Sequence, residues 1–290
     1  MDLFDYAEKD FGGVYALMLT PYKHDLSVDW GVYEKYCDYQ AASGAHKLFC
    51  VCGSSEMTKL SIPERLKLAE ITVKRANGLK VFATANLSEG LENQLEEIKR
   101  MEETGVDGLV FVTHGMGEKP EFVEYIGALA NAASLPALIY EFPGMSPHRV
   151  GADIYGELVR YGYIKGIKDT TSTLEGIAGK LDRQGDSCVL QANIPFLYDA
   201  FELGARGCVA TPSTVGSSLI RKFYDAYAAG DKTEAKRLHG RVCMLADLID
   251  QNYTAGAKYF MRLKGVPFEP LCRTGATLSG QRCRHIEACV

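Results

Sequence analysis

The sequence lacks three features that mark whole classes of protein. No apolar run reaches the roughly 18 residues that a membrane-spanning helix needs, so we expect no membrane protein. Basic residues are not in excess, since 32 Lys and Arg stand against 37 Asp and Glu, and the formal net charge of -5 predicts no binding to nucleic acid or to anionic membranes. Residues 1–11 carry five charged side chains and no apolar core, so we expect no signal peptide.

The sequence also lacks cysteines in a regular, paired spacing. Its nine cysteines stand at positions 37, 50, 52, 188, 208, 243, 272, 283 and 289. An odd number of scattered cysteines, several within apolar segments, indicates reduced thiols packed like small apolar side chains in a cytoplasmic protein. Cys50 and Cys52 offer only two neighbouring sulfur ligands, too few for a zinc site, and we predict no bound metal.

What the sequence has is a regular alternation of short apolar segments and amphipathic segments. The short segments are almost wholly apolar, which is typical of parallel strands buried on both faces. Eight such units, spaced by about 20 to 34 residues, predict a closed (β/α)8 TIM barrel rather than an open doubly wound sheet. The predicted strands are Val14–Leu19, Lys47–Cys52, Val81–Ala85, Gly108–Thr113, Ala137–Tyr140, Ile164–Lys168, Cys188–Gln191 and Gly207–Ala210.

Helix signals occupy the segments between and after these strands. Asp29 is a capping residue for a helix that we predict to reach Ala42, and Ser61, followed by Pro63, caps another. Further helices are predicted over Leu91–Thr104, Leu219–Ala229, Thr233–Gln251 and Thr254–Leu263. One of the last three closes the barrel. We therefore expect the barrel in residues 1–225 and a C-terminal helical extension in residues 226–290, packed together as one structural unit.

The chemistry of a TIM barrel lies at the C-terminal ends of its strands, so polar residues there are the candidate site residues. They are Gly53, Ser54, Ser55, Glu56, Thr113, His114, Tyr140, Glu141, Lys168, Asp169, Asn193, Thr211 and Ser213.

Lys168 is the most informative of these residues, because it lies in a strand that is otherwise expected to be buried. Burial disfavours the charged form of lysine, and the neutral amine is the form that attacks a ketone to give a Schiff base. The alternative is a structural lysine that pairs with Asp169 or extends to solvent.

Tyr140, Ser54 and Ser55 each have a structural and a functional interpretation. The hydroxyl of Tyr140 either moves protons at a reacting group or lies in water at the rim of the barrel. Ser54 and Ser55 follow Gly53 at a strand-to-helix turn, where hydroxyl and backbone N–H groups either bind a carboxylate or only stabilise the turn.

Five short motifs stand in order along the predicted barrel: Gly13–Tyr22, Gly53–Glu56, Tyr140–Pro143, Gly166–Thr171 and Gly204–Val209. Together they resemble the dihydrodipicolinate synthase / N-acetylneuraminate lyase family of class I aldolases, over almost the whole barrel. Tyr140 and Lys168 lie 28 positions apart, as they do in that family.

The resemblance implies a role for each matching residue. Lys168 would form an imine with pyruvate or a related 2-keto acid, and Tyr140 would move protons above it. Ser54, with Ser55 and the backbone of the loop, would bind the carboxylate, and the backbone of Val209 would lie near the bound keto acid. The family needs no cofactor and no metal, and its members are commonly homotetramers, so we expect a homo-oligomer, either a tetramer or a dimer.

Four departures from the family's pattern concern the second substrate. Gly53 occupies one of the family's two adjacent hydroxyl positions when the loop is aligned on its Glu. Met145 stands where dihydrodipicolinate synthases have an Arg, and Thr113–Glu118 lacks their relay tyrosine, for which His114 could substitute. Glu141 replaces the family's Asn. Asn193 and Gly53 remain further candidate site residues.

These departures leave the imine half of the reaction intact and alter the groups that choose the electrophile. We therefore predict a carbon–carbon lyase or aldolase that joins a 2-keto acid to an aldehyde or an imine. A pocket with Phe142, Met145 and Gly115 would suit a less charged or bulkier second substrate.

Other functions stay open at this point. They are a genuine 4-hydroxy-tetrahydrodipicolinate synthase of lysine biosynthesis and a non-catalytic relative that only binds keto acids. A phosphate-binding barrel is disfavoured because the loops that begin at Asn193 and Thr211 lack the required glycines. A metal-dependent aldolase is disfavoured because His114 is the single histidine at a predicted strand end.

Overall fold

The computed structural model of the protein describes residue 5 and residues 11–290. The prediction that residues 1–11 form no signal peptide therefore falls mostly outside the described residues. No helix in the described part of the chain combines the length and the apolarity needed to cross a membrane.

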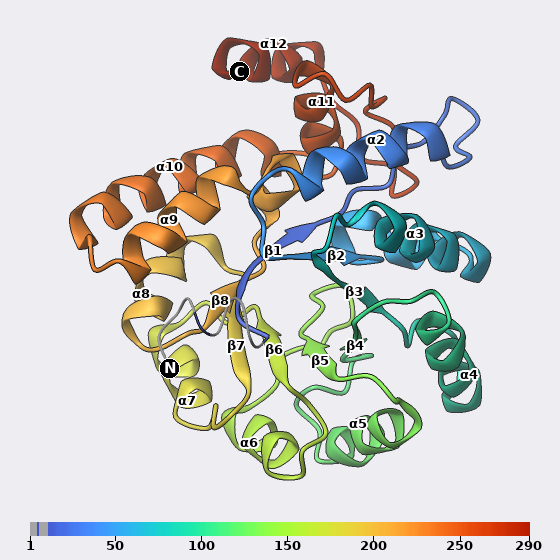
Figure 1. Ribbon diagram of the computed structural model, residues 1–290, viewed down its shortest axis with the longest axis vertical. Coiled ribbons are helices and arrows are strands. Elements are labelled where there is room, and N and C mark those ends of the chain that lie inside the picture. Colours follow the sequence, from blue (N-terminus) through green and yellow to red (C-terminus); the bar gives the residue numbers. More distant parts are fainter. Residues whose placement is uncertain (1–4, 6–10) are drawn as a thin grey trace.

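Eight parallel strands close into a barrel in chain order, with β1 paired to both β2 and β8 (Figure 1). The predicted TIM barrel is confirmed, and each predicted strand is present. The strands are β1 (Gly13–Leu17), β2 (Lys47–Cys50), β3 (Lys80–Thr84), β4 (Gly108–Val112), β5 (Ala137–Tyr140), β6 (Gly166–Asp169), β7 (Cys188–Gln191) and β8 (Gly207–Cys208).

The barrel closes where β8 meets β1, and glycine makes this contact possible. A Cβ atom on Gly207 would lie 2.2 Å from the carbonyl oxygen of Gly13, far inside van der Waals contact. Only a residue without a side chain fits this position, because the two backbones approach so closely. The strand residues themselves are buried almost throughout, as the apolar segments predict.

Helices surround the barrel and continue beyond it (Figure 1). They are α2 (Trp30–Ala41), α3 (Ile62–Arg75), α4 (Leu91–Glu102), α5 (Glu121–Ala132), α6 (Ala152–Arg160), α7 (Leu174–Leu181), α8 (Leu197–Glu202), α9 (Ser218–Ala228), α10 (Lys232–Asp250), α11 (Ala255–Leu263) and α12 (Gly280–Cys289).

Both predicted capping residues begin their helices. The carboxylate of Asp29 accepts a hydrogen bond from the backbone N–H of Val32, and the hydroxyl of Ser61 accepts one from Glu64, whose carboxylate bonds back to the N–H of Ser61.

The C-terminal extension packs against the barrel through α2. The ring of Tyr36 on α2 lies edge-on to the ring of Phe268, with centroids 5.0 Å apart. The expected limit of the barrel at residue 225 falls inside α9, the helix that follows β8. Helix α12 was not predicted, because its sequence is mostly polar and Ile286 is its one buried residue.

All nine cysteines lie in the described part of the chain, and none of them forms a disulfide there. Six are buried, as expected for cysteines that pack like small apolar side chains: Cys37, Cys50, Cys52, Cys188, Cys208 and Cys272.

Candidate active site

Lys168 lies on β6 with its side chain inside the barrel mouth and only 6% of the residue exposed. Its Nζ atom is 4.0 Å from the ring centroid of Tyr140 and 5.7 Å from that of Phe49. Among the described residues its ammonium group has no carboxylate and no hydrogen-bond partner.

Burial away from any carboxylate lowers the pKa of Lys168 to about 8, because desolvation disfavours the charged form. At this pKa about a tenth of the amine is neutral at pH 7, against fewer than about one in a thousand for an ordinary lysine. The side chain therefore has the environment of a nucleophilic amine rather than that of a structural cation.

The alternative in which Lys168 pairs with Asp169 is wrong. Successive residues of a strand point to opposite faces of the sheet, so Asp169 points away from Lys168 into the layer between barrel and helices. Its carboxylate there lies 2.7 Å from Nζ of Lys180 and accepts a hydrogen bond of 3.0 Å from Gln191.

Tyr140, the last residue of β5, is paired in register with Lys168 on the neighbouring strand. Its ring packs against Phe142, with centroids 5.4 Å apart, and burial raises the pKa of its hydroxyl far above the usual value, so the group stays protonated. A Cβ atom on Gly53 would lie 3.0 Å from this hydroxyl. Glycine at position 53 thus lets the loop after β2 approach Tyr140 closely.

Ser54 lies in this loop, a 3-10 turn over Gly53–Ser55, and is buried. Its Oγ atom accepts a hydrogen bond of 2.6 Å from the hydroxyl of Tyr253, which lies between α10 and α11. Tyr253 was not predicted as a site residue. It is 199 positions from Ser54 in the sequence, and no local motif connects the two.

Ser55 is placed differently from Ser54, although both are buried. Its hydroxyl donates to the carbonyl of Met18 at 2.6 Å and accepts from the backbone N–H of Cys52 at 3.1 Å. These bonds join the loop to β1, so the side chain of Ser55 is engaged with the backbone rather than turned toward Lys168.

Glu56 fixes the end of the same loop to the C-terminal extension. Its backbone is left-handed, with φ of 57°, and its buried carboxylate lies 2.6 Å from Nζ of Lys258 on α11. The other carboxylate oxygen accepts a hydrogen bond of 2.9 Å from the N–H of Thr274. Two segments after the barrel therefore hold the loop that carries Ser54.

Val209 and Asn193 lie at the same end of the barrel as Lys168. Val209 directly follows β8 and donates its N–H to the carbonyl of Gln191 at 3.0 Å. Asn193 follows β7, and its N–H donates to the side-chain oxygen of Gln191 at 2.6 Å. Their backbones are therefore tied to β7, next to the strand of Lys168.

The structure does not bring Glu141 to Lys168. As the residue after Tyr140 it points to the opposite face, where its carboxylate contacts Lys180 and accepts hydrogen bonds from the N–H groups of Val150 at 2.7 Å and Thr170 at 2.8 Å. Burial raises the pKa of Glu141, and the neighbouring Lys180 opposes that shift.

The side chain of His114 contacts the loop after β3 and helix α5. Its Nε2 atom contacts the carbonyl oxygen of Asn86, and its ring lies edge-on to Tyr125, with centroids 6.2 Å apart. His114 also lines a cavity of about 470 Å³, together with Met145 and Met57.

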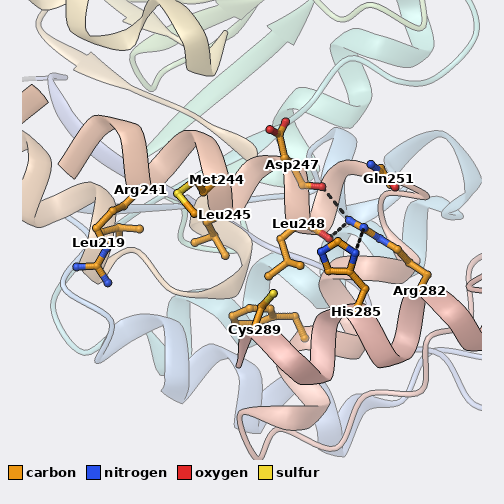
Figure 2. Close-up of a pocket in the computed structure, with 11 residues that line it drawn as sticks. Leu219, Arg241, Met244, Leu245, Asp247, Leu248, Gln251, Arg282, His285 and Cys289 are labelled. Atoms are coloured by element: carbon orange, nitrogen blue, oxygen red, sulfur yellow. Dashed lines mark hydrogen bonds between the residues drawn. The ribbon is translucent and has the colours of Figure 1, made fainter. Parts of the chain in front are cut away.

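A second cavity, of about 460 Å³, lies between α10 and α12, and none of the predicted site residues lines it (Figure 2). Two arginines line it, Arg241 and Arg282, and the guanidinium group of Arg282 donates to the carbonyl oxygens of Asp247 and Leu248 near the end of α10. Arg282 therefore stabilises the end of a helix, and the candidate catalytic residues lie at the barrel mouth instead.

Comparisons with known proteins identify the family of the chain. A model of the dihydrodipicolinate synthetase family matches residues 10–284. The 4-hydroxy-tetrahydrodipicolinate synthase of Bradyrhizobium diazoefficiens is 25% identical over 263 residues, which cover 89% of this chain and 88% of that protein. The enzyme of the same name from Acidiphilium cryptum is 27% identical over 268 residues, 91% of each chain.

Solved structures share the fold. YagE, a prophage protein of E. coli K12 whose structure contains pyruvate, superposes with a TM-score of 0.88 at 18% identity and covers 96% of this chain and 97% of its own. A monomeric dihydrodipicolinate synthase variant gives a TM-score of 0.88 at 19% identity, covering 96% of this chain and 95% of its own. With the family model matched over nearly its whole length, the chain belongs to the dihydrodipicolinate synthetase family, a family of class I aldolase-type lyases.

Proposed function

We propose that the protein is a Schiff-base lyase in which Lys168 forms an imine with pyruvate or a related 2-keto acid. The observation that carries the proposal is the buried Nζ of Lys168, which faces the ring of Tyr140 at 4.0 Å and has no ion-pair partner among the described residues. The pyruvate in the structure of YagE supports the choice of keto acid.

The proposed steps use groups that are close together at the barrel mouth. The neutral amine of Lys168 attacks the C2 carbonyl of the keto acid, and the carbinolamine loses water to give the imine. The hydroxyl of Tyr140 supplies the proton for the departing water and accepts one when C3 is deprotonated to the enamine. The enamine then attacks the carbonyl of an aldehyde or the carbon of an imine, which restores the imine to Lys168, and water hydrolyses this imine to release the product and the free amine. No step needs a metal or a cofactor.

The second substrate is proposed to be less charged or bulkier than that of a dihydrodipicolinate synthase. Met145 lines the cavity beside His114, at the position where those enzymes have an Arg for a second carboxylate. Introducing that Arg, by Met145→Arg, should increase the rate with aspartate semialdehyde. No gain in this rate would count against Met145 as the residue that selects the electrophile.

The names of the relatives support a second candidate, 4-hydroxy-tetrahydrodipicolinate synthase activity itself. The product of pyruvate and aspartate semialdehyde, assayed with the unaltered protein, distinguishes the two candidates. We further propose a homo-oligomer in the cytoplasm, a dimer or a tetramer, to be checked by analytical ultracentrifugation.

Borohydride reduction in the presence of pyruvate tests the proposed imine. Intact-mass spectrometry should show one reduced pyruvate adduct, and peptide mapping should place it on Lys168. The adduct should be absent in Lys168→Ala and retained in Lys165→Ala, a matched change at an exposed lysine of the same segment. Keto-acid binding without any adduct would favour the non-catalytic relative instead.

A further inference from the structure

Tyr253 reaches the candidate site from outside the barrel. It lies between α10 and α11, and its hydroxyl is 2.6 Å from Oγ of Ser54. The ring is half-buried, whereas burial of its hydroxyl end raises the pKa of Tyr253 well above 10, so the group remains a hydrogen-bond donor at every pH at which the protein is studied.

The direction of this hydrogen bond decides what Ser54 can do. Tyr253 donates and Ser54 accepts, and a serine hydroxyl has one proton of its own in addition to its acceptor lone pairs. Among the described residues no acceptor is recorded for the proton of Ser54. Its neighbour Ser55 differs on this point, because the proton of Ser55 is donated to the carbonyl of Met18.

Tyr140 connects the loop of Ser54 to the reacting lysine. Ser54 follows Gly53, and the backbone of Gly53 lies next to the hydroxyl of Tyr140. The ring of Tyr140 in turn lies next to Nζ of Lys168. A 2-keto acid on Lys168 would carry its carboxylate directly on the imine carbon, on the side of the barrel mouth that this loop and Tyr140 share.

We infer that Tyr253 is a positioning residue for the carboxylate of the 2-keto acid: by donating to Ser54 it directs the proton of Ser54 toward that carboxylate. The inference rests on the proposed function and adds a residue to it. Tyr253, Ser54 and the carboxylate would then form a chain of two hydrogen bonds that ends on an anion. In such a chain each hydrogen bond polarises and strengthens the next.

The segment around Tyr253 is anchored independently of its hydroxyl. Thr254 donates to the carboxylate of Glu56 at 3.3 Å, and Lys258 contacts the same carboxylate at 2.6 Å. Tyr253→Phe therefore removes one hydroxyl group and leaves the backbone beside Ser54 in place.

The test compares Tyr253→Phe with Tyr33→Phe. Tyr33 is a matched control because its hydroxyl is also buried against a side-chain hydroxyl, that of Thr72 at 2.7 Å, between α2 and α3. The readout is the pyruvate concentration that gives half-maximal borohydride trapping on Lys168, measured in parallel with methyl pyruvate, which lacks the carboxylate charge.

Tyr253→Phe should raise the half-saturating concentration of pyruvate by roughly fivefold to tenfold and leave that of methyl pyruvate unchanged, since a hydrogen bond to an anion is lost. Tyr33→Phe should change neither value. Ser54→Ala should match Tyr253→Phe, and the double variant should be no weaker than Ser54→Ala alone.

Two results would overturn the inference while leaving the proposed imine intact. These are unchanged pyruvate trapping in Tyr253→Phe, or an equal loss with pyruvate and methyl pyruvate, which would show a general structural effect. No trapping of either ketone by the unaltered protein would overturn the proposed function and this inference together.

Discussion

Lys168 and Lys180 are two buried lysines on opposite sides of the same strand, and their surroundings are opposite in kind. Lys180, on α7, contacts the carboxylates of Glu141 and Asp169 and the hydroxyl of Thr171. Lys168, on β6, faces the rings of Tyr140 and Phe49. Burial with carboxylates retains a cation, whereas burial among rings favours the neutral amine, so the partners of a buried lysine indicate its task.

The lysine on α11 follows the pattern of Lys180. Lys258 contacts the carboxylate of Glu56 at 2.6 Å and the carbonyl oxygen of Leu271 at 2.7 Å, and it is fully buried. Both structural lysines hold loops or strand ends that carry site residues. Lys168 is the buried lysine whose ammonium has no such oxygen partner in the described part of the chain.

Lys180 also explains an unusual residue of the site. Glu141 and Asp169 each directly follow a candidate catalytic residue, Tyr140 and Lys168, on neighbouring strands. By contacting both carboxylates, the ammonium group of Lys180 holds the ends of β5 and β6 together from the outer face. The family's motif has Asn at this position. In this chain the carboxylate of Glu141 forms an ion pair with Lys180.

The largest effect is expected from Lys168→Met. Imine formation with pyruvate should fall to background, because the nucleophile is removed. The free energy of unfolding at pH 7 should rise by up to about 3 kcal/mol, since an unpaired buried amine is replaced by an apolar side chain of similar length. Denaturant unfolding and borohydride trapping check the two expectations, and a marked loss of stability would show that Lys168 has a structural partner.

Lys180→Met should have the opposite outcome. Two buried carboxylates lose their cation, and breaking such a group costs about 3 to 5 kcal/mol of unfolding free energy. Denaturant unfolding at pH 7 measures the loss. If Lys168→Met and Lys180→Met had equal free energies of unfolding, the distinction between a nucleophilic Lys168 and a structural Lys180 would be wrong.

The pH dependence of stability sharpens the comparison further. The folded-state pKa of Lys168, about 8, lies below the value of 10.5 for an ordinary lysine, so between these pH values the unfolded chain binds more protons and stability rises with pH. The stability advantage of Lys168→Met over the unaltered protein should therefore shrink by about 3 kcal/mol from pH 8 to 10.5. Groups common to both proteins cancel, and a constant difference would contradict the lowered pKa.

The smallest effect is expected from Glu141→Asn. Lys180 keeps Asp169 as a partner, and the lost hydrogen bonds to the carboxylate should lower the free energy of unfolding by about 1 to 2 kcal/mol. The maximal rate of imine formation should fall by less than tenfold, because Lys168 itself is untouched. A change in stability with an unchanged rate would limit the Lys180 contact to a structural role.

Much of the fold and the centre of the site could be predicted, because they depend on local patterns. Apolar segments marked every strand, and the rule that barrel chemistry lies at strand ends placed Lys168 and Tyr140 among the candidates. The expected burial of Lys168 and the resemblance to the family then gave these two residues their predicted roles. Strict alternation along a strand would also have placed Glu141 on the outer face, once Tyr140 was assigned to the inside.

The remaining features depend on contacts between distant parts of the sequence. Tyr253 meets Ser54 only because the chain returns across the barrel mouth after α10, and no periodicity encodes that path. Lys180 lies on a helix, where a lysine is usually exposed, and its burial follows from two carboxylates on neighbouring strands. Helix α12 buries a single apolar residue, too few to give a helical pattern.

The most direct measurement is the rate of imine formation with pyruvate across a pH series, trapped by sodium cyanoborohydride and mapped onto each buried lysine. We predict an adduct on Lys168 and none on Lys180 or Lys258, with a rate that is half-maximal near pH 8, the pKa of the buried amine. An adduct on either paired lysine, or a rate that rises only near the pH of an ordinary lysine, would contradict the assignment of Lys168 as the nucleophile.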